Sequence, residues 1–182
     1  MSDIVACICE GAAEEAIINL LLDSQLLVFE RSDLLEETIF RRMNPKVFCA
    51  NHLSRNFGER KVRINRILDS KKEKFEILRT YKKKVSMNEV YCTCPEIEML
   101  IIISEKRAEE YNRKYKSRHK PSAYCKKFLR LSNVKNKEFV NEYYRDAHKL
   151  VDAIKEYKRI HSFGPNEKCL CDLLKNSIIV NS

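Results

Sequence analysis

Changes in the spacing of hydrophobic positions predict that the chain begins with a strand followed by a helix. Residues 4–9 (IVACIC) are continuously apolar, which is typical of a short strand covered on both faces in a parallel sheet. In residues 12–22 the apolar side chains recur at helical spacing, and Glu14 and Glu15 lie in the first turn, where the helix dipole favours acids. The opening of the chain is therefore predicted to be a βα unit.

The alternation of strand and helix patterns continues well beyond this unit. A second strand is expected at residues 26–29, followed by a helix that begins near the capping-box pair Asp33 and Glu36. Pro45 starts a short helix that reaches about Asn56, because proline suits the first helical position. The next expected elements are a strand at 62–68, a basic helix capped by Ser70 and Glu73 that runs through Lys84, a strand at 89–93 and a long helix opened by Pro95.

Strands that alternate with helices indicate an α/β fold, with a mostly parallel sheet of about four strands flanked by helices. Beyond Arg118 every remaining pattern is helical. These helices are expected at residues 121–131, 137–145, 147–160 and 170–174. We therefore expect an α/β core at residues 1–105 and a helical C-terminal extension at residues 106–182 that packs on this core as one compact unit.

Composition narrows the class of protein. The chain has 182 residues, of which 44% are hydrophobic and 34% charged, with a mean hydropathy of −0.46, as expected of a folded, water-soluble protein. Its three glycines, Gly11, Gly58 and Gly164, lie too far apart to form a G-x-G-x-x-G motif, a P-loop or a G-x-S-x-G motif. None of the four histidines lies in H-E-x-x-H, which excludes a zincin-type metalloprotease.

The sequence predicts neither export nor membrane insertion. Its first residues, MSDIVACICEG, lack a basic segment followed by a long apolar stretch. The apolar run at residues 99–103 is far shorter than the roughly 18 residues that a membrane span needs. We therefore expect a cytoplasmic protein with no membrane partner, whose eight cysteines are reduced thiols.

Six of the cysteines are arranged as C-x-C pairs. The pairs are Cys7/Cys9, Cys92/Cys94 and Cys169/Cys171. This spacing is a poor match for structural zinc sites, which prefer C-x₂₋₄-C. In a strand, side chains two positions apart point to the same face, so Cys7 and Cys9 are interpreted as small core residues. Cys92 and Cys94 flank the expected edge of the sheet, where the alternatives are core residues and a redox-sensitive or metal-binding pair.

Charge is distributed unevenly along the chain. Residues 1–40 carry nine acids and one base, whereas residues 41–182 carry 17 acids and 34 bases, and the whole chain has a formal net charge of +9. Bases are densest in two stretches, residues 60–84 and 106–130. A surface of this kind attracts a polyanion, so nucleic acid is the expected partner.

Bases of these two stretches are the candidate ligands for nucleic-acid phosphates. They are Lys71, Lys72, Arg113, Lys116 and Lys120. The second stretch interleaves its bases with aromatic side chains that are candidates for stacking on nucleobases, namely Tyr111, Tyr115, Tyr124 and Phe128. The alternative is a solvated helix face whose tyrosines lie half in the core.

Acidic residues follow the expected ends of several strands. Glu10 follows the first strand and Asp69 the third, while Glu96 and Glu98 come just after the fourth. In a parallel sheet these strand ends lie at one edge, which is where α/β proteins bind ligands. Converging carboxylates are the hard oxygen ligands that Mg²⁺ or Mn²⁺ prefers, and a metal held there can clamp a phosphodiester and activate water.

Helix capping is the alternative explanation for some of these acids. Glu14, Glu73 and Glu96 are expected in first helical turns, where the helix dipole alone accounts for an acid. Capping explains Glu10 and Asp69 less well, because each of them ends an apolar strand.

Two motifs, in this order, resemble those of Toprim-like proteins. Residues 10–14 (EGAAE), after an apolar strand, are similar to the E-G-x-x-E opening of that family, especially of its RloB and OLD types. Residues 95–101 (PEIEMLI) are similar to the Pro-x-hydrophobic-Glu-x-hydrophobic-Leu-Leu segment of RloB-like chains. The resemblance covers about residues 3–105 and, more loosely, the predicted helix at 146–157.

The resemblance implies a Toprim-like fold and metal-dependent phosphodiester cleavage in bacterial restriction or phage defence. It implies four catalytic residues: Glu10 as general acid/base or metal ligand, Glu14 as a supporting acid, Asp69 as a ligand of Mg²⁺ or Mn²⁺, and Glu98 lining the site. By analogy with OLD-type systems, a larger ATPase is also implied as a partner that docks on the helical C-terminal half.

At one position the chain departs from that family. Toprim sites usually show Asp-x-Asp after the third strand, whereas this chain reads Asp69-Ser70-Lys71. A lysine there weakens divalent binding by like-charge repulsion or itself holds a phosphate. The sequence therefore leaves two functions open: a metal-dependent nuclease, and a non-catalytic module that binds nucleic acid or regulates a partner.

Overall fold

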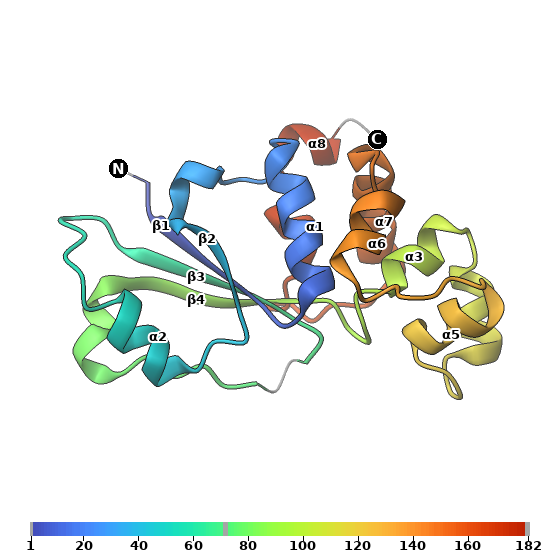
Figure 1. Cartoon of the computed structure of the whole chain (residues 1–182), viewed down its shortest axis with the longest axis horizontal. Coiled ribbons are helices and arrows are strands. Elements are labelled where there is room, and N and C mark those ends of the chain that lie inside the picture. Colours follow the sequence, from blue (N-terminus) through green and yellow to red (C-terminus); the bar gives the residue numbers. More distant parts are fainter. Residues whose placement is uncertain (1, 71–72, 181–182) are drawn as a thin grey trace.

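A sheet of four parallel strands forms the centre of the protein, in a computed structural model that describes residues 2–70 and 73–180 (Figure 1). The strands are β1 (Ile4–Cys9), β2 (Leu34–Arg41), β3 (Val62–Leu68) and β4 (Val85–Cys92), in the spatial order β2-β1-β3-β4. Each neighbouring pair runs parallel. The predicted α/β class, with a mostly parallel sheet of about four strands, is confirmed.

Both faces of the sheet are covered, as the continuous apolar run of β1 predicts. Cys7 and Cys9 point to one face and belong to one buried cluster, whereas Ala6 and Ile8 belong to another cluster on the opposite face. This alternation follows from the period of two in a strand. A strand whose two faces are both buried has no polar side, so its sequence shows an apolar run and no alternation.

Helices from both halves of the chain cover the first face of the sheet (Figure 1). They are α1 (Ala12–Asp23), α3 (Met99–Ser104), α6 (Lys137–Tyr143) and α7 (Ala147–Ile160). The buried side chains of α1 and α7 share one cluster, as Ile17 and Ile154 illustrate. The expected helical C-terminal half is therefore present, and it packs on the sheet.

The second face is covered by α2 (Pro45–His52) and a 3₁₀ helix at Arg79–Lys84. The side chain of Asn44 caps α2 by accepting the backbone N–H groups of Lys46 and Val47. The predicted start of this helix at Pro45 is confirmed, and its end comes four residues earlier than expected.

The remaining elements are short. They are a 3₁₀ helix at Arg31–Asp33, α4 (Ala108–Glu110), a π-helical turn at Tyr111–Tyr115, α5 (Pro121–Phe128), a 3₁₀ helix at Leu170–Leu173 and α8 (Asn176–Val180). Helix α5 lies beyond the carboxyl ends of the strands (Figure 1). In residues 2–70 and 73–180, no helix is both long and apolar enough to pass through a membrane.

The predicted second strand is wrong, and so is the helix predicted after it. Of residues 26–29, only Leu27 makes an isolated bridge, to Leu174. Strand β2 forms where the pair Asp33 and Glu36 predicted a helix. Asp33 instead accepts the backbone N–H of Glu30 at 2.9 Å, so the acid that looked like a helix start closes the short 3₁₀ helix before the strand.

An irregularity in β2 hides its pattern from the sequence. Glu36 and Glu37 adopt φ values of 59° and 53°, and the register against β1 shifts in this region. A bulge of this kind breaks the alternation of buried and exposed positions. The strand therefore has no readable period of two.

The basic helix predicted at residues 70–84 is also wrong for the residues described. Residues 73–78 have no helical structure, and only Arg79–Lys84 form a 3₁₀ helix. Phe75 is buried against the second face of the sheet, and its carbonyl accepts the side-chain amide of Asn88 at 2.8 Å. These tertiary contacts outweigh the helix propensity of the segment.

The fourth strand begins earlier than predicted and the helix after it begins later. Strand β4 starts at Val85, and α3 starts at Met99. Between them the Cys94–Pro95 peptide bond is cis, and residues 95–98 form turns. The helix predicted to open at Pro95 is thus replaced by a turn that carries Glu96 and Glu98.

Candidate functional site

Four residues follow the four parallel strands at one edge of the sheet. Glu10 follows β1, Arg42 follows β2, Asp69 follows β3 and Thr93 follows β4. Because β1 and β3 are neighbours, Glu10 and Asp69 lie side by side. Parallel topology therefore brings together two acids that are distant along the chain.

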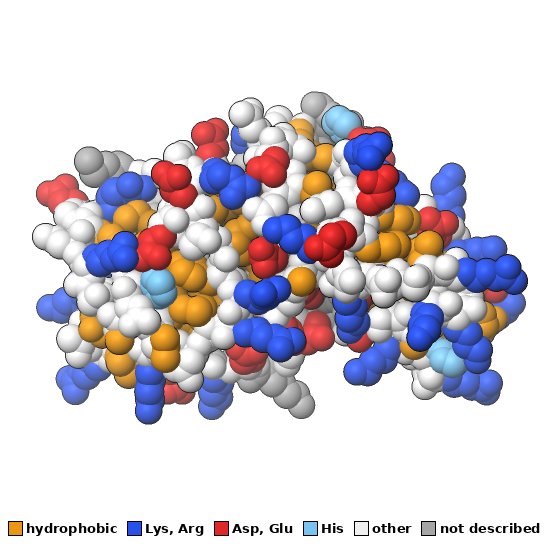
Figure 2. All heavy atoms as spheres, in the orientation of Figure 1, with side chains coloured by type: hydrophobic (Ala, Val, Ile, Leu, Met, Phe, Trp, Pro, Cys, Tyr) orange, Lys and Arg blue, Asp and Glu red, His pale blue; other side chains and the backbone are white. Residues whose placement is uncertain are grey.

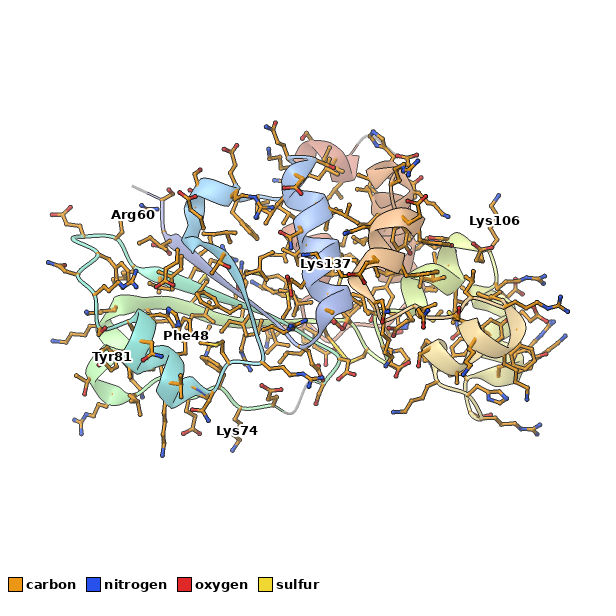
Figure 3. All side chains as sticks on the ribbon, in the orientation of Figure 1. Phe48, Arg60, Lys74, Tyr81, Lys106 and Lys137 are labelled. Atoms are coloured by element: carbon orange, nitrogen blue, oxygen red, sulfur yellow. A yellow bond between two sulfur atoms is a disulfide. The ribbon has the colours of Figure 1, made fainter. Side chains whose placement is uncertain are left out.

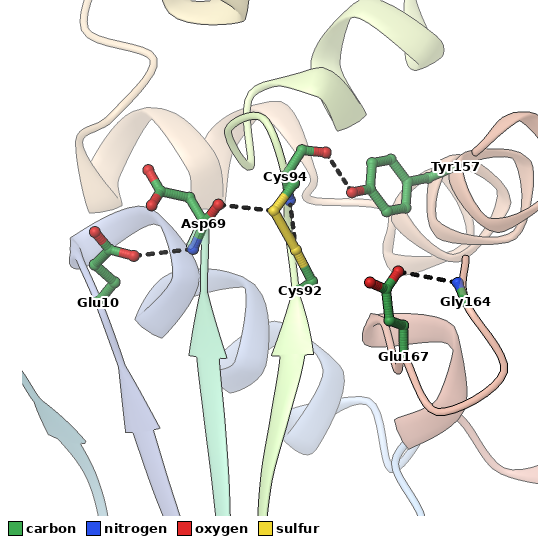
Figure 4. The surroundings of a disulfide bond; sticks show 7 residues. All are labelled: Glu10, Asp69, Cys92, Cys94, Tyr157, Gly164 and Glu167. Atoms are coloured by element: carbon green, nitrogen blue, oxygen red, sulfur yellow. Dashed lines mark hydrogen bonds between the residues drawn. A yellow bond between two sulfur atoms is a disulfide. The ribbon is translucent and has the colours of Figure 1, made fainter. Parts of the chain in front are cut away.

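The carboxyl groups of Glu10 and Asp69 are adjacent (Figure 4). The backbone N–H of Asp69 donates a hydrogen bond of 2.9 Å to Oε2 of Glu10. Burial raises the pKa of Glu10, the bond from the Asp69 backbone lowers it, and the negative charge of the Asp69 carboxylate raises it again. The net rise comes mainly from burial, and the neighbouring Asp69 carboxylate adds to it.

Glu14, in the first turn of α1, faces the same pair. It is only 8% exposed, and burial together with the charges of Glu10 and Asp69 raises its pKa. A Cβ atom on Gly11 would lie 2.9 Å from a carboxylate oxygen of Glu14, so glycine leaves room for this carboxylate beside the backbone. Hydrogen bonds from the backbone groups of Gly11 and Glu14 lower the pKa of Glu14 and so partly offset this rise. Glu14 therefore combines the expected helix-start position with a place near the two strand-end acids.

Glu98 is the most deeply buried of the four predicted catalytic residues, with 2% exposure. Burial raises its pKa to about 7, with the charge of Lys135 opposing the rise and those of Glu96 and Glu14 adding to it. At neutral pH this carboxyl group is therefore close to half protonated.

Glu96 connects the turn after β4 to the start of α5. Its carboxylate accepts the backbone N–H of Ser122 at 2.9 Å and pairs with Lys135 at 3.2 Å. Burial tends to raise the pKa of Glu96, but these partners lower it overall. The capping interpretation of Glu96 is wrong for the helix predicted to open at Pro95, because α3 begins at Met99; the carboxylate instead accepts a backbone N–H in the first turn of α5. For Glu73 the capping interpretation is wrong, because no helix begins there.

All four predicted catalytic residues line one cavity of about 250 Å³. Its charged lining consists of Glu10, Glu14, Asp69, Glu96, Glu98, Arg42 and Lys135. Acids and bases therefore face each other across a space large enough for a phosphate group and a few waters.

The carboxylate oxygens of this cavity suit a hard divalent cation that takes few of its ligands from the protein. Among residues 2–70 and 73–180, no three His, Cys, Asp or Glu side chains are grouped so as to hold a metal ion. Mg²⁺ at phosphate-processing sites often has only one or two carboxylate ligands, with waters and substrate oxygens in the other positions. The adjacent carboxylates of Glu10 and Asp69 fit that pattern.

Two basic residues of the cavity were not predicted from the sequence. Arg42 follows β2, the strand that the sequence pattern misplaced, and its Nε donates to the backbone carbonyl of Glu10 at 2.9 Å. Its φ of 50° is uncommon for a residue other than glycine. Lys135 lies in a loop between helices, where no sequence pattern marks it.

The predicted nucleic-acid ligands do not form one group. Lys71 and Lys72 lie outside the described residues. Lys116 and Lys120 line a cavity of about 340 Å³ that also includes Pro95, next to the acids. Arg113 lines a separate cavity of about 810 Å³ between α4 and α7.

Residues 111–130, which we call the basic lobe, contain eight bases and no acid. All eight are exposed, and in the described part of the chain only Lys114 forms an ion pair, with Glu110 at 3.7 Å. Figure 2 shows basic side chains gathered at this end of the molecule, around α5. The lobe is therefore a surface of largely uncompensated positive charge.

Few aromatic side chains of the basic lobe are free to stack on a nucleobase. Tyr111 and Tyr124 are buried, so the alternative of core tyrosines holds for both. Phe128 is 38% exposed, and its ring centroid lies 4.4 Å from that of the half-buried Tyr115. Only this pair offers ring surface beside the lysines.

The expectation of reduced thiols is wrong for one C-x-C pair. Cys92 and Cys94 form a disulfide at the end of β4 (Figure 4). The other six cysteines are free and buried. No known protein family, no curated protein and no solved structure matches the chain.

Proposed function

We propose that the protein is a divalent-metal-dependent nuclease, a Toprim-like phosphodiesterase of the RloB/OLD type with a role in restriction or phage defence. The observation that carries the proposal is the side-by-side placement of Glu10 and Asp69 in a cavity that also holds Arg42 and Lys135. Neighbouring carboxylates repel each other, and a bound cation removes that repulsion.

The residues of the cavity divide the work of phosphodiester hydrolysis among them. Mg²⁺ or Mn²⁺ would supply a positive charge for the phosphate oxygens and an acidic bound water. Glu10 and Asp69 would hold the ion through their carboxylates. Arg42 and Lys135, which line the cavity, would bind non-bridging oxygens, and Glu98, with a pKa of about 7, would accept and return a proton near neutral pH.

Nucleic acid is the substrate class that the surface charge supports best. We call the 250 Å³ cavity lined by Glu10, Asp69 and Glu98 the acidic cavity. Glu96 lines this cavity, and the preceding residue, Pro95, lines the cavity beside Lys116 and Lys120. A polynucleotide that binds its phosphates on the basic lobe therefore has a short path to the acids. The exposed ring of Phe128 adds a surface for stacking, which favours unpaired bases over a duplex.

Calorimetry and a cleavage assay test this function together. Wild type is expected to bind Mn²⁺ and to cut single-stranded DNA or RNA in a reaction that EDTA stops, whereas Glu10→Gln is expected to lose both properties. Glu138→Gln, which changes an exposed acid at the start of α6, is the matched control and should retain both. Absence of Mn²⁺ heat in wild type would remove the catalytic proposal.

A non-catalytic nucleic-acid-binding module is the second candidate. It is favoured by the lysine at position 71, in the place of the second acid of Asp-x-Asp, and by the lack of a third grouped ligand among the described residues. This function predicts binding that weakens steeply with salt and is indifferent to EDTA. Binding that does not respond to salt would contradict it.

The larger ATPase implied by the resemblance remains the proposed protein partner, with the helical C-terminal half as its docking surface. A chain that elutes from gel filtration as a monodisperse, nucleic-acid-free monomer and never cleaves would favour this interaction role over the two functions above.

A further inference from the structure

The disulfide between Cys92 and Cys94 is held by three neighbouring parts of the fold. The backbone N–H of Cys92 donates to the carbonyl of Lys168 at 2.8 Å, and that of the intervening Thr93 donates to the carbonyl of Leu68 at 2.8 Å. The hydroxyl of Tyr157 donates to the carbonyl of Cys94 (Figure 4). The disulfide ring is thus fixed between β3, helix α7 and the segment around Lys168.

This disulfide touches the candidate site directly. The Sγ atom of Cys94 lies 2.8 Å from the backbone carbonyl oxygen of Asp69, whose N–H holds the carboxylate of Glu10 (Figure 4). In the other direction along the chain, Glu96 and Glu98 follow Cys94 by two and four residues. A change in the bonding of Cys94 therefore affects Asp69, which follows β3, and also Glu96 and Glu98, which follow β4.

We propose that Cys92 and Cys94 form a reversible redox centre that exchanges with cellular thiols and sets the divalent-cation affinity of the neighbouring Glu10–Asp69 pair. The coupling to the cation rests on the proposed function. The redox centre itself rests on the disulfide and its surroundings.

Position separates this pair from the other cysteines. Cys169 and Cys171 have the same spacing, yet both are free and buried in the core. Cys94 is half-buried at the surface, and Cys92 borders an open cavity of about 360 Å³ that also includes Lys168. A thiol approaching from solvent therefore meets this disulfide first, and accessible disulfides are the labile and regulatory ones.

Reduction takes two thiol molecules of the glutathione type. The first, as a thiolate, attacks Sγ of Cys94, the disulfide bond breaks, and Cys92 leaves as a thiolate that takes up a proton. The second thiolate attacks the sulfur of the first molecule in the mixed disulfide, which releases the oxidised disulfide of the small thiol and the Cys94 thiolate, and this thiolate also takes up a proton. Two electrons and two protons have then been transferred to the protein.

Opening the ring changes how the site is held. In the disulfide, Cys94 is tied covalently to the end of β4, so the turn that carries Glu98 is fixed relative to Asp69. In the dithiol this covalent tie is gone. The segment is then held by non-covalent bonds alone, namely the backbone bonds of Cys92 and Thr93, the Tyr157 hydroxyl and the new S–H group of Cys94 facing the carbonyl of Asp69. A less preorganised site binds its ligand more weakly. The oxidised protein is therefore expected to bind the cation more tightly.

Titration of the full-length chain with Mn²⁺, once oxidised and once reduced and desalted without oxygen, tests the coupling. We expect the oxidised form to bind about five-fold more tightly or better, the lower end of typical coupling between linked sites. The double variant Cys92→Ser/Cys94→Ser should bind like the reduced form and should not respond to reductant. Cys169→Ser/Cys171→Ser is the matched control and should keep the wild-type difference. Equal affinities of oxidised and reduced wild type would overturn the coupling.

Equilibration in glutathione buffers tests the redox centre and needs no variant. Mass spectrometry after alkylation gives the ratio of disulfide to dithiol. Linkage requires saturating Mg²⁺ to shift this ratio toward the disulfide by a factor equal to the ratio of the Mg²⁺ affinities of the oxidised and reduced forms, measured by titration. A folded protein whose disulfide no glutathione buffer reduces would overturn the redox centre. If neither form binds a cation, the proposed function and the coupling fail, while the glutathione ratio still decides whether the pair is redox-active.

Discussion

The backbone N–H of Asp69 donates a hydrogen bond of 2.9 Å to the carboxylate of Glu10, which lies 59 residues earlier in the chain. A glutamine at position 10 keeps a carbonyl oxygen that can accept this bond but carries no charge. Glu10→Gln therefore separates the electrostatic role of Glu10 from its geometric role, which a change to alanine would mix.

Divalent cations are expected to stabilise wild type and not Glu10→Gln. A ligand that binds only the folded state at 100 times its Kd adds about 2.7 kcal/mol to the free energy of unfolding. Thermal unfolding with and without Mn²⁺ measures this difference, and Glu138→Gln should show the wild-type rise in Tm. Without metal, Glu10→Gln should be at least as stable as wild type, because the repulsion from Asp69 is gone. An equal rise in Tm for Glu10→Gln would show that the ion binds elsewhere.

Glu98 is expected to make the metal-free protein less stable as pH rises from about 4.5 to about 7. Its pKa is raised to about 7 in the folded state, from an ordinary value of 4.5. The folded state thus holds the proton more strongly, and stability is lost as pH rises through the folded pKa, by about 3 kcal/mol in total. Urea unfolding at several pH values should show a shallower slope for Glu98→Gln. Glu138→Gln should keep the wild-type slope, and an unchanged slope in Glu98→Gln would contradict the assignment.

Among the acids outside the acidic cavity, Glu89 on β4 is expected to be the one whose loss lowers the free energy of unfolding most. It pairs with Arg63 at 2.9 Å and Lys168 at 2.5 Å, and it accepts the hydroxyl of Tyr91 at 3.0 Å. Glu89→Gln leaves two half-buried cations without their counter-charge, so a loss of about 1–3 kcal/mol is expected in urea unfolding. Glu76→Gln, at an exposed position, should stay within about 0.5 kcal/mol of wild type. Similar values for the two variants would show that the network adds nothing.

The basic lobe is expected to set the salt dependence of nucleic-acid binding. Lys116→Ala and Lys120→Ala should each reduce the slope of log K against log salt by about one. Phe128→Ala should weaken binding to a single strand by about 1–3 kcal/mol and affect a duplex much less. Lys74, which points to solvent from the segment below the sheet (Figure 3), is the matched control. If Lys74→Ala has the same effect as the lobe variants, binding depends on the net positive charge of the whole protein and not on the basic lobe.

The strand-end acids could be predicted because their placement depends on topology alone. Once β1 and β3 are parallel neighbours, the residues that follow them must share an edge, whatever the loops do. The same reasoning fails for Arg42, because the sequence pattern placed the second strand at residues 26–29 and so ended it at the wrong residue. It fails for Lys135 because a loop between two helices has no periodicity to locate it.

The errors in the fold also have physical causes. Asp33-x-x-Glu36 has the spacing of a capping box, but Asp33 bonds back to Glu30, and the bulge at Glu36 and Glu37 removes the strand pattern. Residues 73–78 have the composition of a basic helix, yet burial of Phe75 holds them in an irregular path. In both cases long-range contacts decide the structure, and a single sequence does not display them.

The carboxylate of Glu96 joins the edge of the sheet to the first turn of α5 and to Lys135. Because this carboxylate links α5 to the turn after β4, it couples the position of the basic lobe to that of the acids. Under the proposed function, a strand bound on the lobe would therefore reach Glu10 and Asp69 at a set distance. Cleavage would then fall at a set number of nucleotides from the bound segment, as with a molecular ruler.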